Sequence, residues 1–502
     1  MSAPDKTLAL PKQEGDMMTT PNSKPGEKGN DAGRPHHTLE QDVEAILGVS
    51  DADIADFTES VVPQTNRRSN LRMLAQFLSM QATFGAVLVG YGARFQGLTL
   101  SELAEAMLIA VAVMSLYCIA SANAGSTTGQ THSVMARSIF GTLGSGLVSI
   151  LLVINGMAFY LFTVKFVIDI TSGLITLPVI GVLTAVLAFV MIVNTYFGFE
   201  GVQRFAQYVA VPVILVWGVI ATFLAFGATS AEVLAAVPQV DSKTGMLIVV
   251  TGMVGLSTWG NEPDFFRYAK AGRASMWNVP TIVISYLVGA FLFPILGYLV
   301  AAISNQPDFG PSISFFVSFT MLGSGILGIV IIVINQWAVQ DGNLYIAVNG
   351  AQNVLSGIPG WRRQYTVIGL GLIAAALTFV LPNLQDTFNL ATSIGSTTVP
   401  VASIIMAIDL FLLPRLFGIN RPMHRVASWN ELGTANWPGV VALACGTLVG
   451  LYCAGLLPLA GSRMIGLPAV QAWITGGVVY LLGVALVHRS ASMKSLLGFS
   501  RI

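Results

Sequence analysis

Hydrophobic residues dominate the chain from residue 71 onward, in long stretches that short polar segments separate. A helix needs about 20 apolar residues to cross the ~30 Å hydrocarbon core of a bilayer. The pattern therefore predicts an all-α polytopic membrane protein with twelve transmembrane helices. The predicted spans are 71–92, 100–122, 145–168, 174–194, 207–227, 245–266, 276–302, 318–345, 366–382, 389–412, 438–459 and 468–488.

Two of these spans contain residues that weaken a helix. They are Gly85, Gly90 and Gly92 in the first span, and Gly252, Gly255, Gly260 and Pro263 in the sixth. Broken backbone is tolerated at membrane depth only where it lines a cavity or is buried in protein. Two interrupted spans in corresponding positions predict the substrate site of a transporter. Close helix packing through small residues is the alternative.

The spacing of the two interrupted spans predicts an internal repeat. They lie five predicted helices apart, which divides the membrane region into repeats at 71–227 and 245–412 and extra helices at 438–488. An odd number of helices per repeat turns the second copy over in the membrane. We therefore expect a five-plus-five inverted repeat followed by two C-terminal helices.

Charge is concentrated at the N-terminus. Only 10% of the 502 residues are charged and the mean hydropathy is +0.71, whereas soluble domains carry about 25% charged residues. Residues 1–66 hold 17 of the 50 charged side chains and predict a polar, largely disordered cytoplasmic tail. This tail is either a solvated segment or a regulatory gate. The transporter domain is expected at 67–490, with a cytoplasmic C-terminal tail at 491–502.

The remaining basic residues predict the orientation in the cytoplasmic membrane. With the N-terminus inside, sixteen Lys and Arg residues lie in cytoplasmic segments and four lie outside, so both termini are expected in the cytoplasm. A net charge of zero without a basic patch argues against nucleic-acid binding. Three cysteines in apolar stretches exclude a disulfide scaffold. No H-E-x-x-H motif, P-loop or usable nucleophile elbow is present, so we expect no enzyme, cofactor or metal site.

Polar and aromatic residues within the spans are the candidate substrate-binding groups. They are Gln81, Phe84, Asn155, Phe159, Ser257, Trp259, Asn335 and Gln340. Aromatic faces can stack on a planar ring, and amides can donate and accept hydrogen bonds at its edge. The set therefore suggests a flat polar ligand, although each aromatic residue taken singly is also compatible with core packing. Asp341 is the one acidic residue well inside a predicted span.

Four charged residues close the sixth span. Glu262, Asp264, Arg267 and Lys270 follow the break within a few residues of one another. We expect an ion-pair cluster at the cytoplasmic face, with a cytoplasmic gate as the alternative.

Three stretches carry a family resemblance: TFGAVLVGYGARFQGLT, GLSTWGNEPDFFRYAK and NQWAVQDGNLYIAVNGAQN. They resemble the nucleobase:cation symporter-1 family, of the purine–cytosine permease type, over residues 67–490. The segment TTGQTHSVMARSIFG is similar to the family's loop before the third helix. The resemblance implies the leucine-transporter type of five-plus-five inverted repeat with twelve helices. It also implies function as a monomer and a nucleobase or a related compound as substrate.

The resemblance also assigns roles to residues of this chain. Phe84 matches a phenylalanine that packs on the base, and Phe159 stands where several relatives have a stacking tryptophan. Gly255 and Ser257 match backbone and hydroxyl contacts at the break of the sixth helix. The polar run of the eighth helix is matched by Asn335, Gln340 and Asp341.

The coupling ion is the point at which this chain departs from the family pattern. Sodium-coupled members carry two hydroxyl residues shortly after the position of Asn335, but here Ala338 and Val339 stand there. Only the first-helix carbonyl groups near Met80 and Thr83 would remain as ligands. We therefore favour H⁺ over Na⁺, with Asp341 as the candidate carrier.

The expected function is secondary active import of cytosine or a purine by cation symport with alternating access. The alternatives are transport of allantoin, a hydantoin or a pyrimidine vitamin precursor, and a non-transporting nutrient receptor.

Overall fold

The computed structural model describes residues 56–499 except 175–179, 236–239, 307–313, 316–317, 322, 356, 381–383, 460–463 and 490–495. Most of the predicted N-terminal tail, and all but four residues of the predicted C-terminal tail, lie outside the described residues.

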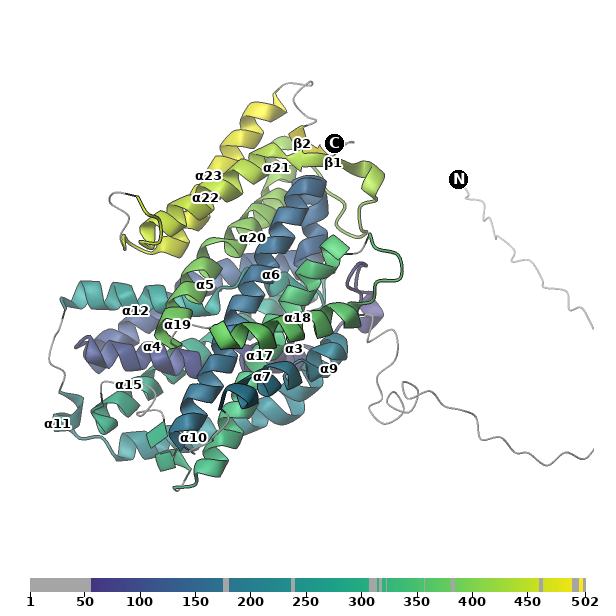
Figure 1. Cartoon of the computed structure of the whole chain (residues 1–502). Helices are drawn as coiled ribbons and strands as arrows, with labels where there is room; N and C mark the ends of the chain where they lie inside the picture. Colours follow the sequence, from purple (N-terminus) through teal and green to yellow (C-terminus); the bar gives the residue numbers. More distant parts are fainter. Residues whose placement is uncertain are drawn as a thin grey trace, which may run out of the picture. The chain divides into compact units, whose positions relative to one another are not determined.

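The first half of the membrane region contains two broken or kinked elements (Figure 1). The first predicted span consists of α3 (Asn70–Gln81) and α4 (Phe84–Phe95), which meet at an angle of 46°. The following elements are α5 (Leu100–Thr128), α6 (His132–Leu174), α7 (Ile180–Val190), α8 (Val193–Tyr196), α9 (Gly198–Phe205), η2 (Ala206–Ala210), α10 (Val211–Gly227) and α11 (Ala231–Leu234).

The second half begins with another broken helix, α12 (Ser242–Ser257) followed by α13 (Glu262–Phe266). Next come η3 (Gly272–Trp277), α14 (Asn278–Tyr286), η4 (Leu287–Leu292), α15 (Phe293–Ser304), α17 (Gly325–Leu355), α18 (Arg363–Leu377), η5 (Thr378–Val380), α19 (Leu384–Thr397), α20 (Val399–Ala407), η6 (Ile408–Leu412) and α21 (Leu413–Phe417). The last elements are η7 (Trp429–Glu431), β1 (Leu432–Asn436), α22 (Trp437–Cys453), α23 (Pro468–His488) and β2 (Leu497–Phe499).

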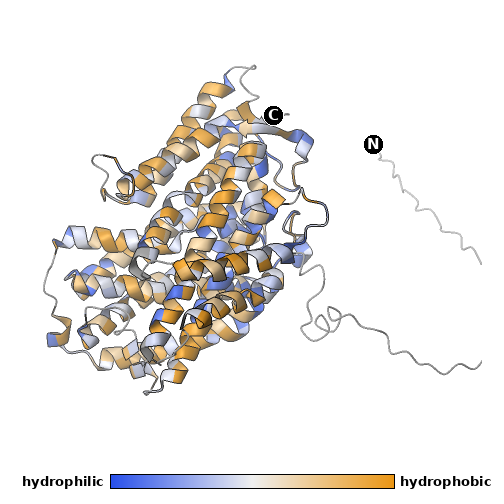
Figure 2. Cartoon of the chain, viewed as in Figure 1, coloured by the Kyte–Doolittle hydropathy of each residue, from blue (hydrophilic) through white to orange (hydrophobic). Residues whose placement is uncertain are grey.

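The described helices confirm the predicted class. Eight of them are long and apolar enough to cross a membrane, or nine if the bent pair α3–α4 is counted as one span. Three shorter apolar helices, at 181–196, 242–257 and 437–453, occupy the remaining predicted positions. Figure 2 shows hydrophobic residues along the long helices. Many large apolar side chains face outward, as a lipid-facing surface requires; Leu116, Phe223 and Leu486 are each more than 70% exposed.

Both predicted interruptions are present. Ala82 and Thr83 have non-helical backbone angles between α3 and α4. Between α12 and α13 the chain is irregular and includes Gly260 at φ 81°. A Cβ at Gly260 would lie 2.5 Å from the Val399 side chain, so this left-handed, tightly packed position needs glycine.

Some predicted boundaries were wrong. The third helix begins at His132 rather than 145, so part of the segment expected as a loop is helical. It kinks at Gly141 (φ 77°), where a Cβ would lie 2.7 Å from the carbonyl oxygen of Gly433. Beyond the membrane helices, β1 and β2 form an antiparallel pair that the hydrophobic pattern did not predict. These strands are too short to show an alternating pattern.

Residues 56–68 lie against the helices, and we call this segment the strap. Val62 is buried, and its N–H donates to the carbonyl of Gly129 at the end of α5 (2.9 Å). Arg68 N–H donates to the carbonyl of Tyr268, just after α13 (2.7 Å). Packing therefore begins before residue 66, where we predicted the tail to end.

Candidate functional site

The break between α3 and α4 is bridged by the side chain of Asn335, from the middle of α17. Its Nδ2 donates to the carbonyl of Ala82 (2.5 Å), and its Oδ1 accepts from the N–H of Phe84 (3.2 Å). These are the backbone groups that the break removes from the helical ladder. Gln336 also donates to the Asn335 Oδ1 (2.8 Å). The amide of Asn335 is thus committed to the backbone of the first helix.

The same arrangement frees one backbone acceptor. In a continuous helix the N–H of Phe84 would bond to the carbonyl of Met80, but here it bonds to Asn335. The Thr83 hydroxyl caps α4 by accepting from the Gly85 N–H (3.2 Å), and the Thr83 carbonyl accepts from Ala86 (3.0 Å). Of the two predicted ion-binding carbonyls, only that of Met80 is released by the break.

Phe84 starts α4, and its ring points into aromatic packing. The ring centroid lies 4.9 Å from that of Trp217 in α10 and 6.1 Å from that of Phe166 in α6. Phe84 is fully buried. Its predicted contact with substrate stays a prediction, since in this conformation its neighbours are protein side chains.

Around the break of the sixth helix, α6 and α19 meet the irregular backbone. Asn155 Nδ2 donates to the carbonyl of Trp259 (3.0 Å), and the ring centroids of Phe159 and Trp259 lie 6.4 Å apart. Gly395 of α19 closes this group: a Cβ there would lie 2.7 Å from both Asn155 Oδ1 and the Phe159 ring. The predicted residues Asn155, Phe159 and Trp259 are therefore neighbours.

The remaining predicted groups of this break serve different purposes. A Cβ at Gly255 would lie 3.0 Å from Thr392, so glycine allows close approach of α12 and α19. The carbonyl of Ser257 accepts from Tyr286 (3.2 Å), whereas its buried hydroxyl has no hydrogen-bond partner. The indole N–H of Trp259 bonds to the carbonyl of Leu256 (2.5 Å). Trp259 therefore offers a ligand its ring face rather than its N–H.

One face of α17 turns toward the break of the first helix and toward α6. Gln336, Gln340 and Asn343 follow one another at helical spacing and share this face. Gln336 donates to the Thr83 hydroxyl (3.3 Å), and Asn343 donates to the Thr163 hydroxyl of α6 (3.4 Å). Gln340, between them, is fully buried and neither of its amide atoms has a hydrogen-bond partner.

Asp341 lies on another face of the same helix. Its Oδ2 accepts from Asn194 of α8 (2.8 Å), and its Oδ1 has no hydrogen-bond partner. Its main-chain carbonyl accepts from Thr195 (3.4 Å). The hydrogen bonds of Asp341 thus go to α8, and the structure does not group it with Met80 and Thr83. Met80 instead packs on Gly342, where a Cβ would lie 2.4 Å from its methyl group.

Several buried polar atoms of these helices have no hydrogen-bond partner. They belong to Gln81, Asn155, Ser257, Asn261, Gln336, Gln340 and Asp341. Buried polar groups are normally hydrogen-bonded, so unpaired amides and hydroxyls beside two helix breaks are groups that a polar ligand could satisfy. Chemically, the site offers donors, acceptors and aromatic faces. Within the described residues, no three His, Cys, Asp or Glu side chains are placed to hold a metal ion.

Sequence reasoning missed Gln336 and Thr163. Gln336 lies four residues before Gln340, and Thr163 lies four residues after Phe159. Extending the two polar stripes by one helical turn would have found both residues.

The charged residues after the sixth helix do not form the expected cluster. Glu262 accepts hydrogen bonds from Tyr117 (3.2 Å) and Ser121 (2.8 Å), while Asp264 accepts from Asn349. Arg267 pairs instead with Asp56 of the strap, with 3.3 Å between Nη2 and Oδ1. The ion-pair prediction was wrong in its partners because the sequence did not place the strap.

Known proteins with similar sequences are nucleobase permeases. The chain is 24% identical over 443 residues to the cytosine permease of Escherichia coli, across 87% of this chain and 96% of that relative.

Solved structures resemble the whole fold. Mhp1, a nucleobase-cation-symport-1 family transporter, in a closed conformation with bromovinylhydantoin bound, gives a TM-score of 0.67 at 15% identity over 88% of this chain and 99% of that one. MhsT in complex with L-phenylalanine gives 0.53 at 13% identity, over 84% and 98%. These likenesses confirm the leucine-transporter type of fold. The family model described as permease for cytosine/purines, uracil, thiamine, allantoin matches residues 61–494, and the chain therefore belongs to this family of membrane transporters.

Proposed function

We propose that the chain imports a nucleobase, cytosine or a purine, by cation symport with alternating access. The observation that carries the substrate class is the amide of Gln340. It is fully buried, unpaired at both atoms, and lies on the α17 face that contacts Thr83 at one helix break and Thr163 of α6. An amide that can both donate and accept matches the edge of a base, which presents donors and acceptors side by side.

The aromatic groups support the same substrate class. Phe159 and Trp259 lie beside each other at the break of the sixth helix, where Asn155 also donates to the Trp259 carbonyl. Stacking of a base on an aromatic face is worth about 1–3 kcal/mol and tolerates any planar ring. We therefore assign ring recognition to Phe159 and Trp259, and edge recognition to Gln340, the Asn155 Oδ1 and the Ser257 hydroxyl.

Proton coupling is the proposed energy source. The carboxylate of Asp341 is buried, accepts one amide hydrogen bond and forms no ion pair with another described residue. A charged carboxylate is costly at membrane depth, which favours a group that binds and releases a proton. Ala338 and Val339 are buried on the same helix and carry no side-chain oxygen for a sodium ion. Sodium binding near the Met80 carbonyl is the competing proposal.

The test is uptake of labelled cytosine by proteoliposomes that contain the purified chain. One set has an inward sodium gradient, and a second has an inward proton gradient without sodium. Proton-driven accumulation supports the proposal, and sodium-driven accumulation moves the coupling site to Met80. A Gln340→Leu variant is the control for transport through the proposed site.

Competition assigns the substrate within the family. Unlabelled adenine, uracil, allantoin, a hydantoin and a thiamine precursor are each added in excess during uptake. If labelled allantoin or a labelled vitamin precursor is accumulated in a parallel assay and labelled cytosine is not, the nucleobase assignment is wrong. Binding of cytosine without accumulation under either gradient would favour a nutrient receptor. Protease digestion of sealed vesicles tests the proposed cytoplasmic location of both termini, and mass measurement in nanodiscs tests the proposed monomer.

A further inference from the structure

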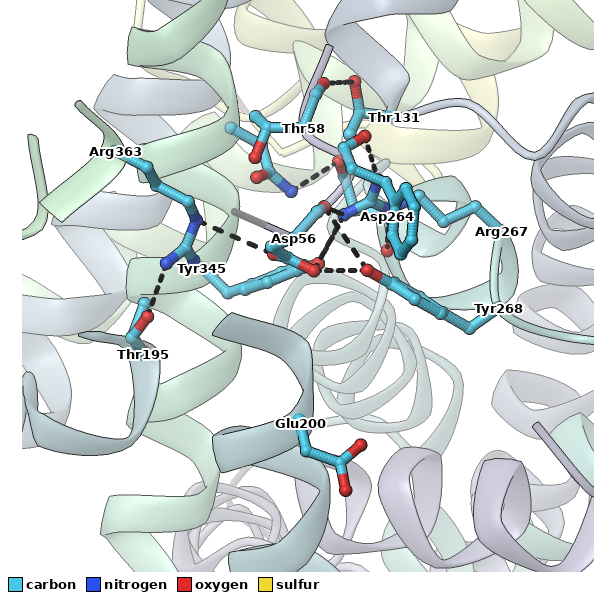
Figure 3. Close-up of polar contacts among 12 residues, drawn as sticks. Asp56, Thr58, Thr131, Thr195, Glu200, Asp264, Arg267, Tyr268, Tyr345 and Arg363 are labelled. Carbon is cyan, nitrogen blue, oxygen red and sulfur yellow. Dashed lines mark hydrogen bonds and ion pairs between the residues drawn. The ribbon is translucent and has the colours of Figure 1, made fainter. Parts of the chain in front are cut away.

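A buried carboxylate from the strap lies between two arginines of different helices (Figure 3). Asp56 Oδ1 lies 3.3 Å from Nη2 of Arg267, which follows α13. Asp56 Oδ2 lies 3.6 Å from Nε of Arg363, the first residue of α18. All three side chains are at most 3% exposed. The single carboxylate of Asp56 therefore pairs with two buried guanidinium groups that belong to separate parts of the fold.

The two halves of this bridge are unequal. Arg267 also donates to the carbonyls of Asp56 and Phe57 (2.8 Å each) and to the Tyr345 hydroxyl (2.7 Å), and the Tyr268 hydroxyl bonds to Asp56. Arg363 has only the 3.6 Å ion pair with Asp56, beyond hydrogen-bond length, and donates to the carbonyl of Thr195 (2.7 Å). The contact with Arg363 is the weaker half.

The backbone of the strap is held in an unfavourable conformation at this point. Asp56 and Phe57 have φ angles of 58° and 43°, in the left-handed region that residues other than glycine avoid. Such conformations persist only where surrounding contacts hold them, and here Arg267 binds both carbonyl groups. Loss of the bridge would allow this strain to be released.

Further contacts fix the strap to other helices. Arg67 donates to the carbonyls of Ser126 in α5 (2.8 Å) and Ala269 (2.6 Å), and burial together with the nearby charge of Arg267 lowers its pKa to about 10. Arg68 pairs with Glu200 of α9 (2.5 Å). The Thr131 hydroxyl at the start of α6 donates to the carbonyl of Thr58 (3.4 Å). Residues far apart in the sequence thus meet on one short segment.

The break before α13 allows this helix to move relative to the helices that the bridge connects. Residues 258–261 separate α13 from α12, so α13 can turn about irregular backbone. By contrast, α17 is one continuous helix, and its Tyr345 receives the hydrogen bond of Arg267. Movement of α13 away from α17 and α18 would have to break the contact of Asp56 with one of its two arginines.

We propose that the strap is a gate built into the fold. By joining Arg267 to Arg363, Asp56 keeps closed the end of the transport path that lies beside α13 and α18. The path opens when the strap leaves Arg363 and moves with α13. The inference rests on the proposed alternating access, but its readout is a distance that needs no substrate.

The test measures the distance between α13 and α17 in the full-length chain in nanodiscs. Spin labels are placed at Lys270→Cys, an exposed site after α13, and Val354→Cys, a 54% exposed site near the end of α17. The three native cysteines are replaced first. Asp56→Asn removes the shared charge. Glu59→Gln, three residues along the strap and exposed, removes an equal charge and is the matched control.

Asp56→Asn is expected to raise the ratio of the longer to the shorter distance by about 5- to 150-fold, the usual range of coupling free energies within a protein. Glu59→Gln is expected to match the wild type. An unchanged distance distribution for Asp56→Asn overturns the proposal. So does a variant that loses thermal stability and cytosine binding together without any change in distance, since Asp56 would then be only a structural anchor.

A second variant keeps the test decisive if Asp56→Asn does not fold. Arg363→Gln removes the weaker contact, together with the Arg363 hydrogen bond to the Thr195 carbonyl, and leaves Arg267, Tyr268 and Asp56 together. It should open the same distance, and an unchanged distance would overturn the proposal. If the distance responds but cytosine is not transported, the gate stands and the substrate assignment fails.

Discussion

Asn335→Ala is the change whose effect the geometry defines most sharply. The side chain makes three hydrogen bonds, and two of them satisfy the Ala82 carbonyl and the Phe84 N–H at the break of the first helix. Alanine leaves both of these buried backbone groups without their partner. The expected primary effect is therefore loss of stability, followed by loss of binding as the break becomes less well ordered.

The magnitude follows from two estimates. Hydrogen bonds between membrane helices are worth about 0.6 kcal/mol on average, so three bonds give about 2 kcal/mol. Orphaning a buried backbone group in a soluble protein costs about 1–3 kcal/mol, which sets an upper estimate near 6 kcal/mol for the two groups. At an unfolding entropy of about 2.1 cal/mol/K per residue, a chain of 502 residues shifts by about 1 °C per kcal/mol, so the lower figure corresponds to about 2 °C in Tm.

The assay is thermal unfolding of the purified variants in one detergent, with cytosine binding measured by calorimetry on the same samples. Asn343→Ala is the matched control, because Asn343 is a buried amide of the same helix with one long hydrogen bond of 3.4 Å to Thr163. Its Tm should fall by less than that of Asn335→Ala. An Asn335→Ala variant with the Tm of the wild type and no cytosine binding would refute the reasoning, because Asn335 would then serve the substrate directly.

Three further predictions test other parts of the fold. Gln340→Leu should reduce cytosine affinity about 10- to 100-fold in calorimetry. Its Tm should be unchanged or higher, because the amide that it removes has no hydrogen-bond partner. Unchanged affinity would show that Gln340 is not part of the site. Asp341→Asn should abolish proton-driven accumulation in proteoliposomes but retain exchange of labelled for unlabelled cytosine, and persistent accumulation would exclude Asp341 as the carrier. Gly90→Ala should lower the free energy of unfolding by about 1–3 kcal/mol or prevent folding, because its Cβ would lie 1.7 Å from the carbonyl oxygen of Pro294. Gly92→Ala is the control and should leave thermal unfolding unchanged, because its Cβ meets no atom within 4 Å. Equal Tm values for the two variants would contradict the packing of α4.

The fold was largely predictable because membrane helices are specified by local composition. Each of the twelve predicted positions holds a helix, and both spans predicted to be interrupted contain a break. Gly260 lies within the second break, whereas the first lies at Ala82 and Thr83, before the glycines of α4. The strap was not predictable in this way. Asp56 is buried by contacts with Arg267 and Arg363, more than two hundred residues away, and nothing in the polarity of residues 51–60 signals that pairing.

The candidate site was predictable in its residue types but not in how they are used. The sequence selected Asn335, Gln340 and Asp341 from one polar run, and Trp259 as an aromatic face for stacking. In the structure, the indole N–H of Trp259 donates to the carbonyl of Leu256, so only the ring face is available to a ligand. Whether a polar atom is free depends on the rotation and depth of each helix against its neighbours, and these are tertiary properties.

The polar run of α17 illustrates why adjacent residues can have separate tasks. Each step along a helix turns the side chain by about 100°, so Asn335, Gln340 and Asp341 point to three different neighbours. Asn335 meets the broken first helix, Gln340 lies on the face toward Thr163 of α6, and Asp341 meets α8. A ligand at Gln340 and a proton at Asp341 would therefore act on one rigid helix from two sides. Coupling between them needs no direct contact, because a tilt of α17 changes both environments and also shifts Tyr345, which holds Arg267 beside the strap.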